Sequence, residues 1–271
     1  MLYQTVPLKA AGIEEEATLT LYVPDNSPEV EEFRRRPGVI ICPGGGYRRL
    51  SFREAEPVAL RLNALGLNAF VLHYSVDPVR YPAAQLQLAL AIDTVKRNAQ
   101  AWLTDAGRVF VAGFSAGGHL AASLGLLWHK EGWAQTLGLD PDDIRPRGMV
   151  LSYPVITSGE FAHRDSFLRL LGERYEELKD NLSLEKQVTD KAVPAFLWHT
   201  YEDSAVPAEN TLLLALELRS CGVPLEMHIY PKGGHGLSLA NDQVNGPDLT
   251  LNIRPECQGW IDMAARWVFS F

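Results

Sequence analysis

The stretch VAGFSAGGHL contains a serine, Ser115, with Gly113 and Gly117 two positions away on either side. A serine in the pattern G-x-S-x-G lies on a sharp turn from a strand to a helix, where larger flanking residues would collide with neighbouring chain. The preceding VFVA is typical of a strand, and the following HLAASLGLLW is typical of an apolar helix. The sequence therefore predicts that Ser115 is a nucleophile, although a tight Gly-Ser turn without chemistry would share the pattern.

A serine hydroxyl needs an imidazole that accepts its proton. Among the seven histidines, His235 is the strongest candidate, because in YPKGGHGLSL it follows an apolar strand and lies between glycines. The remaining histidines have simpler interpretations: packed positions for His73, His119, His199 and His228, and exposed positions for His129 and His163.

The imidazole in turn needs a carboxylate that holds its tautomer and stabilises the imidazolium. Asp203 in FLWHTYEDSAVP comes just after the apolar run AFLW and just before Pro207, which we expect to open a helix. Glu202 is the adjacent alternative. The strand-to-loop position and the following Val-Pro favour Asp203.

The segment PGGGY, residues 43–47, ends another apolar run. Consecutive glycines let the main chain turn so that its N–H groups face a reacting carbonyl oxygen, as an oxyanion hole requires. We expect Gly45 and Gly46 to be donors, with the N–H of Ala116 as a third. A phosphate-binding loop would also be glycine-rich, but its lysine and serine or threonine are missing, and a plain glycine turn is the remaining alternative.

Short apolar runs positioned along the chain predict the strands that hold these residues. Two amino-terminal stretches, 3–8 and 17–23, alternate apolar and polar residues and predict an antiparallel edge. The later runs are continuously apolar and predict central parallel strands: VIIC at 39, LNAFVL at 67, VFVA at 109, MVLSY at 149, AFLW at 195 and LEMHIY at 225.

Helical patterns alternate with these runs, over residues 53–65, 83–103, from 207 to about 222, and 256–271. Such alternation predicts an α/β fold, with a mostly parallel sheet covered by helices on both faces. Residues 157–191 are polar and interrupt the alternation. We expect one domain over residues 1–271, with this segment as a small helical cap or lid.

The overall composition limits the partners. The formal charge of the 271 residues is −8 at pH 7, which argues against nucleic acid as a partner. The three cysteines form no C-x-x-C pair and suggest neither disulfides nor zinc. The first residues lack the pattern of a secretory signal, and no apolar run is long enough to cross a membrane. We expect a cytoplasmic protein; a homo-oligomer is compatible with the sequence.

Six stretches together resemble a known family: PGGGY, FREAEPVALRLNALGLNAFVLHYS, GFSAGGHLAASL, SYPVI, FLWHTYEDSAVP and YPKGGHGLSL. They are similar to bacterial acetyl esterases of the carbohydrate esterase and hormone-sensitive-lipase-like group, especially proteins called acetyl xylan esterase or xylanase-like esterase. The resemblance covers nearly the whole chain and implies the α/β-hydrolase fold, whose chain order is serine, acid, histidine.

Carried over to this chain, the resemblance implies Ser115, Asp203 and His235 as a triad. It also implies an oxyanion hole at Gly45, Gly46 and Ala116. Pro43 replaces the histidine that many lipases of this type have before the glycines, and this weakens a lipase assignment. Tyr47 and Glu54 are further candidates for substrate contact, although Glu54 also fits a simple charge at a helix start.

We therefore expect a serine esterase that removes acetyl groups from small sugars or xylo-oligosaccharides, without metal or organic cofactor. The alternatives are a broad short-chain carboxylesterase and a peptidase of the prolyl-oligopeptidase kind. Such peptidases usually add a propeller domain, for which the chain has no room. A non-catalytic protein on the same scaffold would tend to lack a triad residue.

Overall fold

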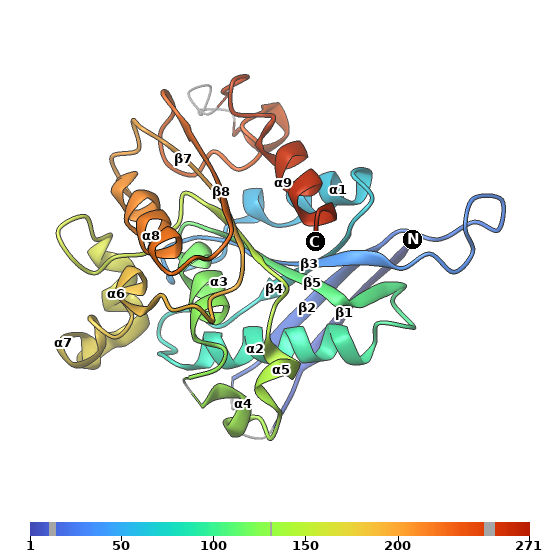
Figure 1. The fold of residues 1–271 in the computed structure, drawn as a ribbon, viewed down its shortest axis with the longest axis horizontal. Helices are drawn as coiled ribbons and strands as arrows, with labels where there is room; N and C mark the ends of the chain where they lie inside the picture. Colours follow the sequence, from blue (N-terminus) through green and yellow to red (C-terminus); the bar gives the residue numbers. More distant parts are fainter. Residues whose placement is uncertain (11–14, 131, 247–252) are drawn as a thin grey trace.

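An eight-stranded sheet runs through the molecule, with helices on both of its faces (Figure 1). The structure is a computed structural model that describes residues 1–10, 15–130, 132–246 and 253–271. The strand order is β1-β2-β4-β3-β5-β6-β7-β8. None of the helices in these described ranges is both long and apolar enough to cross a bilayer.

The first two strands form the antiparallel edge that their alternating pattern predicts. Strand β1 (Leu2–Leu8) pairs with β2 (Ala17–Val23), and β2 also pairs antiparallel with β4. The side chains of β2 are nearly all buried, whereas β1 is largely exposed. The hairpin therefore closes one edge of the sheet.

The other six strands are parallel to one another, as the continuous apolar runs predict. They are β3 (Arg36–Cys42), β4 (Asn68–His73), β5 (Thr104–Phe114), β6 (Met149–Ser152), β7 (Ala195–Thr200) and β8 (Leu225–Tyr230). The prediction that the last of these is central was wrong. Strand β8 lies at the edge, where its side chains are only partly buried.

Two apolar clusters, one on each face, hold the helices on the sheet. One cluster includes α2 (Ala83–Arg97), α3 (Ala116–Leu127) and α8 (Glu209–Ser220). The other includes α1 (Glu56–Ala64) and α9 (Trp260–Phe269). In Figure 1, α1 and α9 lie on one side of the sheet and α2 on the other. This is the layered α/β arrangement expected from the sequence.

The bounds of all four predicted helices differ from the sequence prediction. Helix α8 begins two residues after Pro207, and α9 begins four residues after residue 256. Helix α2 ends at Arg97 rather than near residue 103, because Asn98 is the C-cap and its side chain donates to the Thr94 carbonyl at 2.8 Å. The predicted helix from residue 53 is divided into a short 3-10 turn, η1 (Phe52–Glu54), and α1. Ala55 separates them with a non-helical backbone.

The polar segment between β6 and β7 forms short helices, namely α6 (Arg164–Leu171), η2 (Gly172–Arg174), α7 (Tyr175–Leu178) and η3 (Leu184–Gln187). In Figure 1, α6 and α7 lie outside the sheet, near α8. The remaining short elements are α4 (Trp133–Thr136), α5 (Pro141–Ile144) and η4 (Asp242–Val244).

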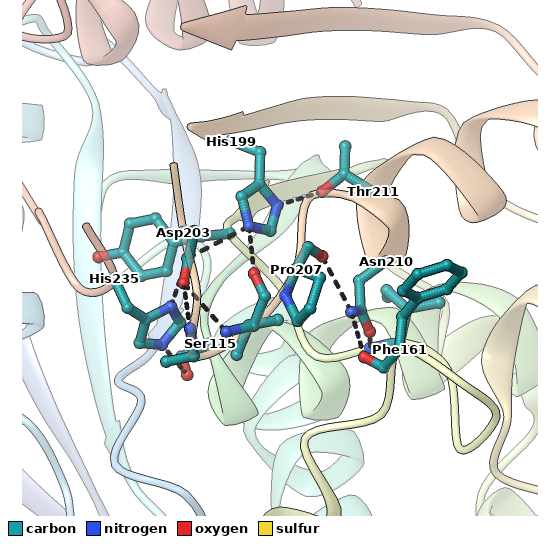
Figure 2. A network of polar contacts seen from close by, with 12 residues as sticks. Ser115, Phe161, His199, Asp203, Pro207, Asn210, Thr211 and His235 are labelled. Carbon is teal, nitrogen blue, oxygen red and sulfur yellow. Dashed lines mark hydrogen bonds and ion pairs between the residues drawn. The ribbon is translucent and has the colours of Figure 1, made fainter. Parts of the chain in front are cut away.

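Asn210, in the first turn of α8, fixes the beginning of the segment between β6 and β7. Its side-chain oxygen accepts from the N–H groups of Ile156 and Thr157 at 2.9 and 3.1 Å. Its amide donates to the carbonyls of Phe161 and Pro207 at 2.9 and 3.0 Å (Figure 2). A fully buried amide with four partners holds this loop in a defined position beside the sheet.

Candidate active site

Ser115 lies on the turn between β5 and α3, in a strained backbone conformation with φ 53° and ψ −119°. Its two flanking glycines have no room for a side chain. A Cβ on Gly113 would lie 2.2 Å from the Gly117 carbonyl oxygen, and a Cβ on Gly117 would lie 2.1 Å from the Cys42 carbonyl oxygen. The close approach of three chain segments therefore explains why glycine is needed at both positions, as the motif predicts.

Ser115, His235 and Asp203 form a continuous chain of hydrogen bonds (Figure 2). The Oγ of Ser115 is 2.7 Å from Nε2 of His235, and Nδ1 of His235 is 2.6 Å from Oδ2 of Asp203. An ionised carboxylate fixes the proton on Nδ1 and leaves Nε2 free to accept the serine proton. These three residues come from different loops, each following a parallel strand.

Asp203 is buried and held by several donors. Its Oδ1 accepts from the N–H groups of Ala205 and Val206, both at 3.0 Å. Burial alone would raise the pKa of this carboxyl, but the side chains of His199 and His235, together with the Val206 N–H, hold the pKa well below its usual range. Asp203 is therefore ionised throughout the pH range in which a histidine base is useful.

His199 contributes to this environment, a role that the sequence prediction missed. The ring is fully buried; its Nε2 donates to the Val206 carbonyl at 2.9 Å and lies 3.3 Å from Oδ2 of Asp203. Its Nδ1 lies 2.8 Å from the Thr211 hydroxyl oxygen. The expectation of a packed histidine describes its burial but not its contact with Asp203.

The glycine loop after β3 has backbone N–H groups beside Ser115. Gly45 and Gly46 have φ values of 124° and 67°, which favour glycine. In the part of the chain that the structure describes, neither of their N–H groups donates to another group of the protein. Ala116 is the first residue of α3, so its N–H has no partner within the helix. These are the donors that the sequence predicts for an oxyanion hole.

Glu54 holds the beginning of this loop through its side chain. It is 3% exposed; its Oε2 accepts from the Gly44 N–H at 2.8 Å, and its Oε1 accepts from the Tyr153 hydroxyl at 2.7 Å. That hydroxyl accepts from the Ser238 N–H at 2.9 Å. These bonds connect the loops of the site. Glu54 also lines the cavity beside Ser115, so its contact with substrate stays a prediction.

Tyr47 does not lie on the cavity, contrary to the expectation that it contacts substrate. Its side chain is 2% exposed, and its hydroxyl lies 3.1 Å from Nδ1 of His119. His119 Nε2 donates to the Leu182 carbonyl at 2.9 Å, and burial lowers the pKa of this histidine to about 4. The apolar ring of Tyr47 therefore packs into the core below the glycine loop.

A cavity of about 290 Å³ opens beside Ser115 and His235. The glycine loop forms one part of its lining, and His163 and Asp165 reach it from the segment between β6 and β7. Burial, and secondarily the charge of His235, lowers the pKa of His163. His163 is thus half-buried at the cavity, not freely exposed as predicted. A larger groove of about 660 Å³ between α8 and β8 shares no lining residue with this cavity.

Comparison with known proteins agrees with this geometry. Residues 39–239 match the family model described as alpha/beta hydrolase fold. The acetyl ester-xyloside bifunctional hydrolase of Caldicellulosiruptor lactoaceticus has a similar structure, with a TM-score of 0.81 and 37% identity over 98% of this chain and 96% of that one. The carboxylesterase Cest-2923 of Lactobacillus plantarum WCFS1 has a TM-score of 0.87 and 29% identity, over 100% and 98%.

The chain therefore belongs to the α/β-hydrolase fold family. This family match, together with relatives whose names include an acetylxylan esterase and an acetyl ester-xyloside hydrolase, confirms the resemblance found in the sequence.

Curated relatives are considerably longer than this chain. The endo-1,4-beta-xylanase B of Butyrivibrio fibrisolvens is 37% identical over 219 residues, which are 77% of this chain but 34% of that protein. The acetylxylan esterase of Xylanibacter ruminicola is 29% identical over 212 residues, or 74% and 41%. The chain thus spans about a third to two fifths of the length of these relatives.

Proposed function

We propose that the protein is a serine esterase that removes acetyl groups from small carbohydrates such as xylo-oligosaccharides. The observation that carries this proposal is the hydrogen-bonded chain from Ser115 through His235 to Asp203, at 2.7 and 2.6 Å. It lies beside N–H groups that have no partner among the residues that the structure describes. The names of the relatives, which include an acetylxylan esterase and an acetyl ester-xyloside hydrolase, support the acetyl group and the sugar.

In this mechanism the Oγ of Ser115 attacks the acetyl carbonyl carbon while Nε2 of His235 accepts its proton. The carbonyl oxygen becomes negatively charged and accepts hydrogen bonds from the N–H groups of Gly45, Gly46 and Ala116. His235 then returns the proton to the leaving sugar oxygen, and an acetyl-enzyme remains. Water, deprotonated by His235, attacks this ester and releases acetate. Asp203 stays ionised throughout.

The size of the cavity supports a small substrate. A volume of about 290 Å³ lies just below the usual range for small-molecule sites, about 300 to 1,000 Å³. Acetyl is the smallest common acyl group, and one or two sugar rings would occupy the rest. Three free cysteines, Cys42, Cys221 and Cys257, fit a reducing compartment. We therefore propose a cytoplasmic enzyme that acts on oligosaccharides.

The function is tested by measuring acetate release from acetylated xylo-oligosaccharides, alongside phenyl acetate and peptides, with the wild type and Ser115→Ala. We expect hydrolysis of both esters by the wild type and at least a 10⁴-fold lower rate for the variant, of the order seen when a nucleophile is removed. Ser123→Ala is the matched control, because this serine lies in α3 with its hydroxyl bonded to the His119 carbonyl.

Different results would contradict different parts of the proposal. Cleavage of aryl esters alone would make the protein a broad short-chain carboxylesterase. Cleavage of peptides alone, dependent on Ser115, would make it a peptidase. Failure of a fluorophosphonate probe to label the wild type, while it labels an active control enzyme, would exclude a serine mechanism.

A further inference from the structure

Three arginines, Arg48, Arg49 and Arg53, line the cavity that contains Ser115. All three belong to the short segment between the glycine loop and α1. Across the described ranges of the chain, none of their guanidinium groups forms an ion pair or a hydrogen bond with protein. The protein as a whole has a formal net charge of −8. The positive charge of this wall of the cavity is therefore opposite in sign to the net charge of the protein.

The acidic side chains of the cavity neutralise this wall only in part. Oδ2 of Asp165 already pairs with Nε of Arg169 at 2.9 Å. Glu54 accepts hydrogen bonds from the neutral Gly44 N–H and Tyr153 hydroxyl, so its single charge can offset only one of the three guanidinium groups. Uncompensated guanidinium groups remain on one wall, where they attract an anion.

The position of Arg53 indicates which part of the substrate the positive charge of the arginines would face. Its Nη2 lies 3.4 Å from the position that a Cβ on Gly236 would occupy, so the guanidinium is next to the loop that carries His235. In the proposed reaction, His235 returns a proton to the leaving alcohol. The guanidinium therefore lies on the alcohol side of the ester rather than on the acetyl side.

We propose that the preferred substrates are acetylated sugars whose alcohol portion carries an anionic group, either a carboxylate or a phosphate. The inference rests on the esterase function proposed above and specifies its substrate. Water cleaves the ester between the acetyl carbon and the sugar oxygen, giving acetate and the free sugar hydroxyl. The anionic group takes no part in this chemistry. It binds to the planar guanidinium groups, which match carboxylate and phosphate geometry.

The test compares three substrates acetylated at the same hydroxyl: a methyl glucoside, the corresponding methyl glucuronide, and glucose 1-phosphate. We expect kcat/KM for at least one anionic substrate to exceed that of the neutral glucoside about tenfold at low ionic strength. Salt screens charges that are partly exposed, so the ratio should fall towards about twofold in roughly 0.5 M sodium chloride. The glucuronide and phosphate results distinguish the two sources of the anion.

Variants show whether the three arginines cause this preference. We expect Arg53→Gln, and the double variant Arg48→Gln/Arg49→Gln, each to lower the ratio of anionic to neutral kcat/KM by about threefold or more. The matched controls are Arg266→Gln, on the exposed face of α9, and Arg34→Gln/Arg35→Gln, another pair of adjacent exposed arginines. These controls change the net charge equally and should leave the ratio as it is in the wild type.

Phenyl acetate separates this inference from the function on which it rests. If the wild type hydrolyses phenyl acetate but shows no preference for either anionic sugar, the inference is wrong and the esterase function stands. If the preference exists but the control variants reduce it as much as the cavity variants do, the assignment to these arginines is wrong. If phenyl acetate and all the sugars are inert, the proposed function fails as well.

Discussion

Glu54 illustrates how a single buried side chain can organise several loops. Its carboxylate joins Gly44, which precedes the predicted oxyanion donors, to Tyr153, whose ring centroid is 5.1 Å from that of His235. The Tyr153 hydroxyl in turn accepts from Ser238, in the loop after His235. We infer that Glu54 is a positioning residue in the proposed reaction, where it would orient the groups on both sides of the substrate carbonyl.

Removing the Glu54 carboxylate should reduce turnover more than substrate binding. We expect Glu54→Ala to lower kcat about 10- to 100-fold with a small change in KM, because a misplaced oxyanion donor chiefly affects the transition state. Glu54→Gln should recover part of this loss, since its amide oxygen can still accept from Gly44. Initial rates on phenyl acetate measure both effects.

Glu56→Ala is the control for this pair of variants, because Glu56 is a nearby carboxylate that bonds Tyr22 instead of the site. The thermal unfolding of each variant should be measured in parallel. Equal kcat values for the wild type and a folded Glu54→Ala protein would contradict the positioning role.

Sequence patterns identify the residues whose spacing along the chain is itself informative. The structure brings Ser115, His235 and Asp203 within hydrogen-bond distance, as the motif and the chain order predict. The bond between Glu54 and Tyr153 joins positions 99 apart, and no local pattern signals it. The buried position of Tyr47 is similarly the result of packing against His119. Such contacts depend on three-dimensional folding, so one sequence does not reveal them.

Strands were predictable because continuous apolar runs are typical of strands covered on both faces. All eight predicted strands are present, with ends that differ by a few residues. The edge position of β8 was not predictable, because LEMHIY resembles the central runs in composition. Helix ends depended on capping contacts such as that of Asn98, which the apolar pattern alone does not contain.

The close packing of β5 against α3 at the turn between them can be tested with a single substitution. Gly113→Ala would place a Cβ 2.2 Å from the Gly117 carbonyl oxygen, so β5 and α3 would have to separate. We expect the free energy of unfolding to fall by about 3 kcal/mol, at the upper end of the usual cost of overpacking. Urea unfolding followed by circular dichroism gives this value.

Gly259→Ala is the matched control, because no atom lies within 4 Å of its ideal Cβ position and its backbone is helical. This change should alter the free energy of unfolding by less than about 1 kcal/mol. If the two alanine variants were equally stable, close packing at the turn would not be the reason for glycine at position 113.

At the level of the whole molecule, buried histidines make stability depend on pH. Burial lowers the pKa of His73, His119, His129 and His163. A histidine whose pKa is lower in the folded state binds its proton more readily in the unfolded state. The free energy of unfolding should therefore decrease as the pH falls below about 6.5.

His119 makes the largest resolved contribution, with a folded pKa of about 4. Between pH 7 and pH 5, its protonation in the unfolded state should cost about 2 kcal/mol. His119→Gln should therefore lose about 2 kcal/mol less than the wild type over this interval. Tyr47→Phe, which keeps the buried histidine, should lose as much as the wild type. Urea unfolding at both pH values measures the loss for each of the three proteins, and identical losses in wild type and His119→Gln would contradict this account.

The placement of the chain ends has a consequence for the architecture of longer proteins. The N-terminus lies toward the end of the long axis opposite α6 and α7, and the C-terminus lies near its middle, beside α9 (Figure 1). Asp165, at the cavity, belongs to α6. A module joined at the N-terminus would therefore emerge away from this wall of the cavity.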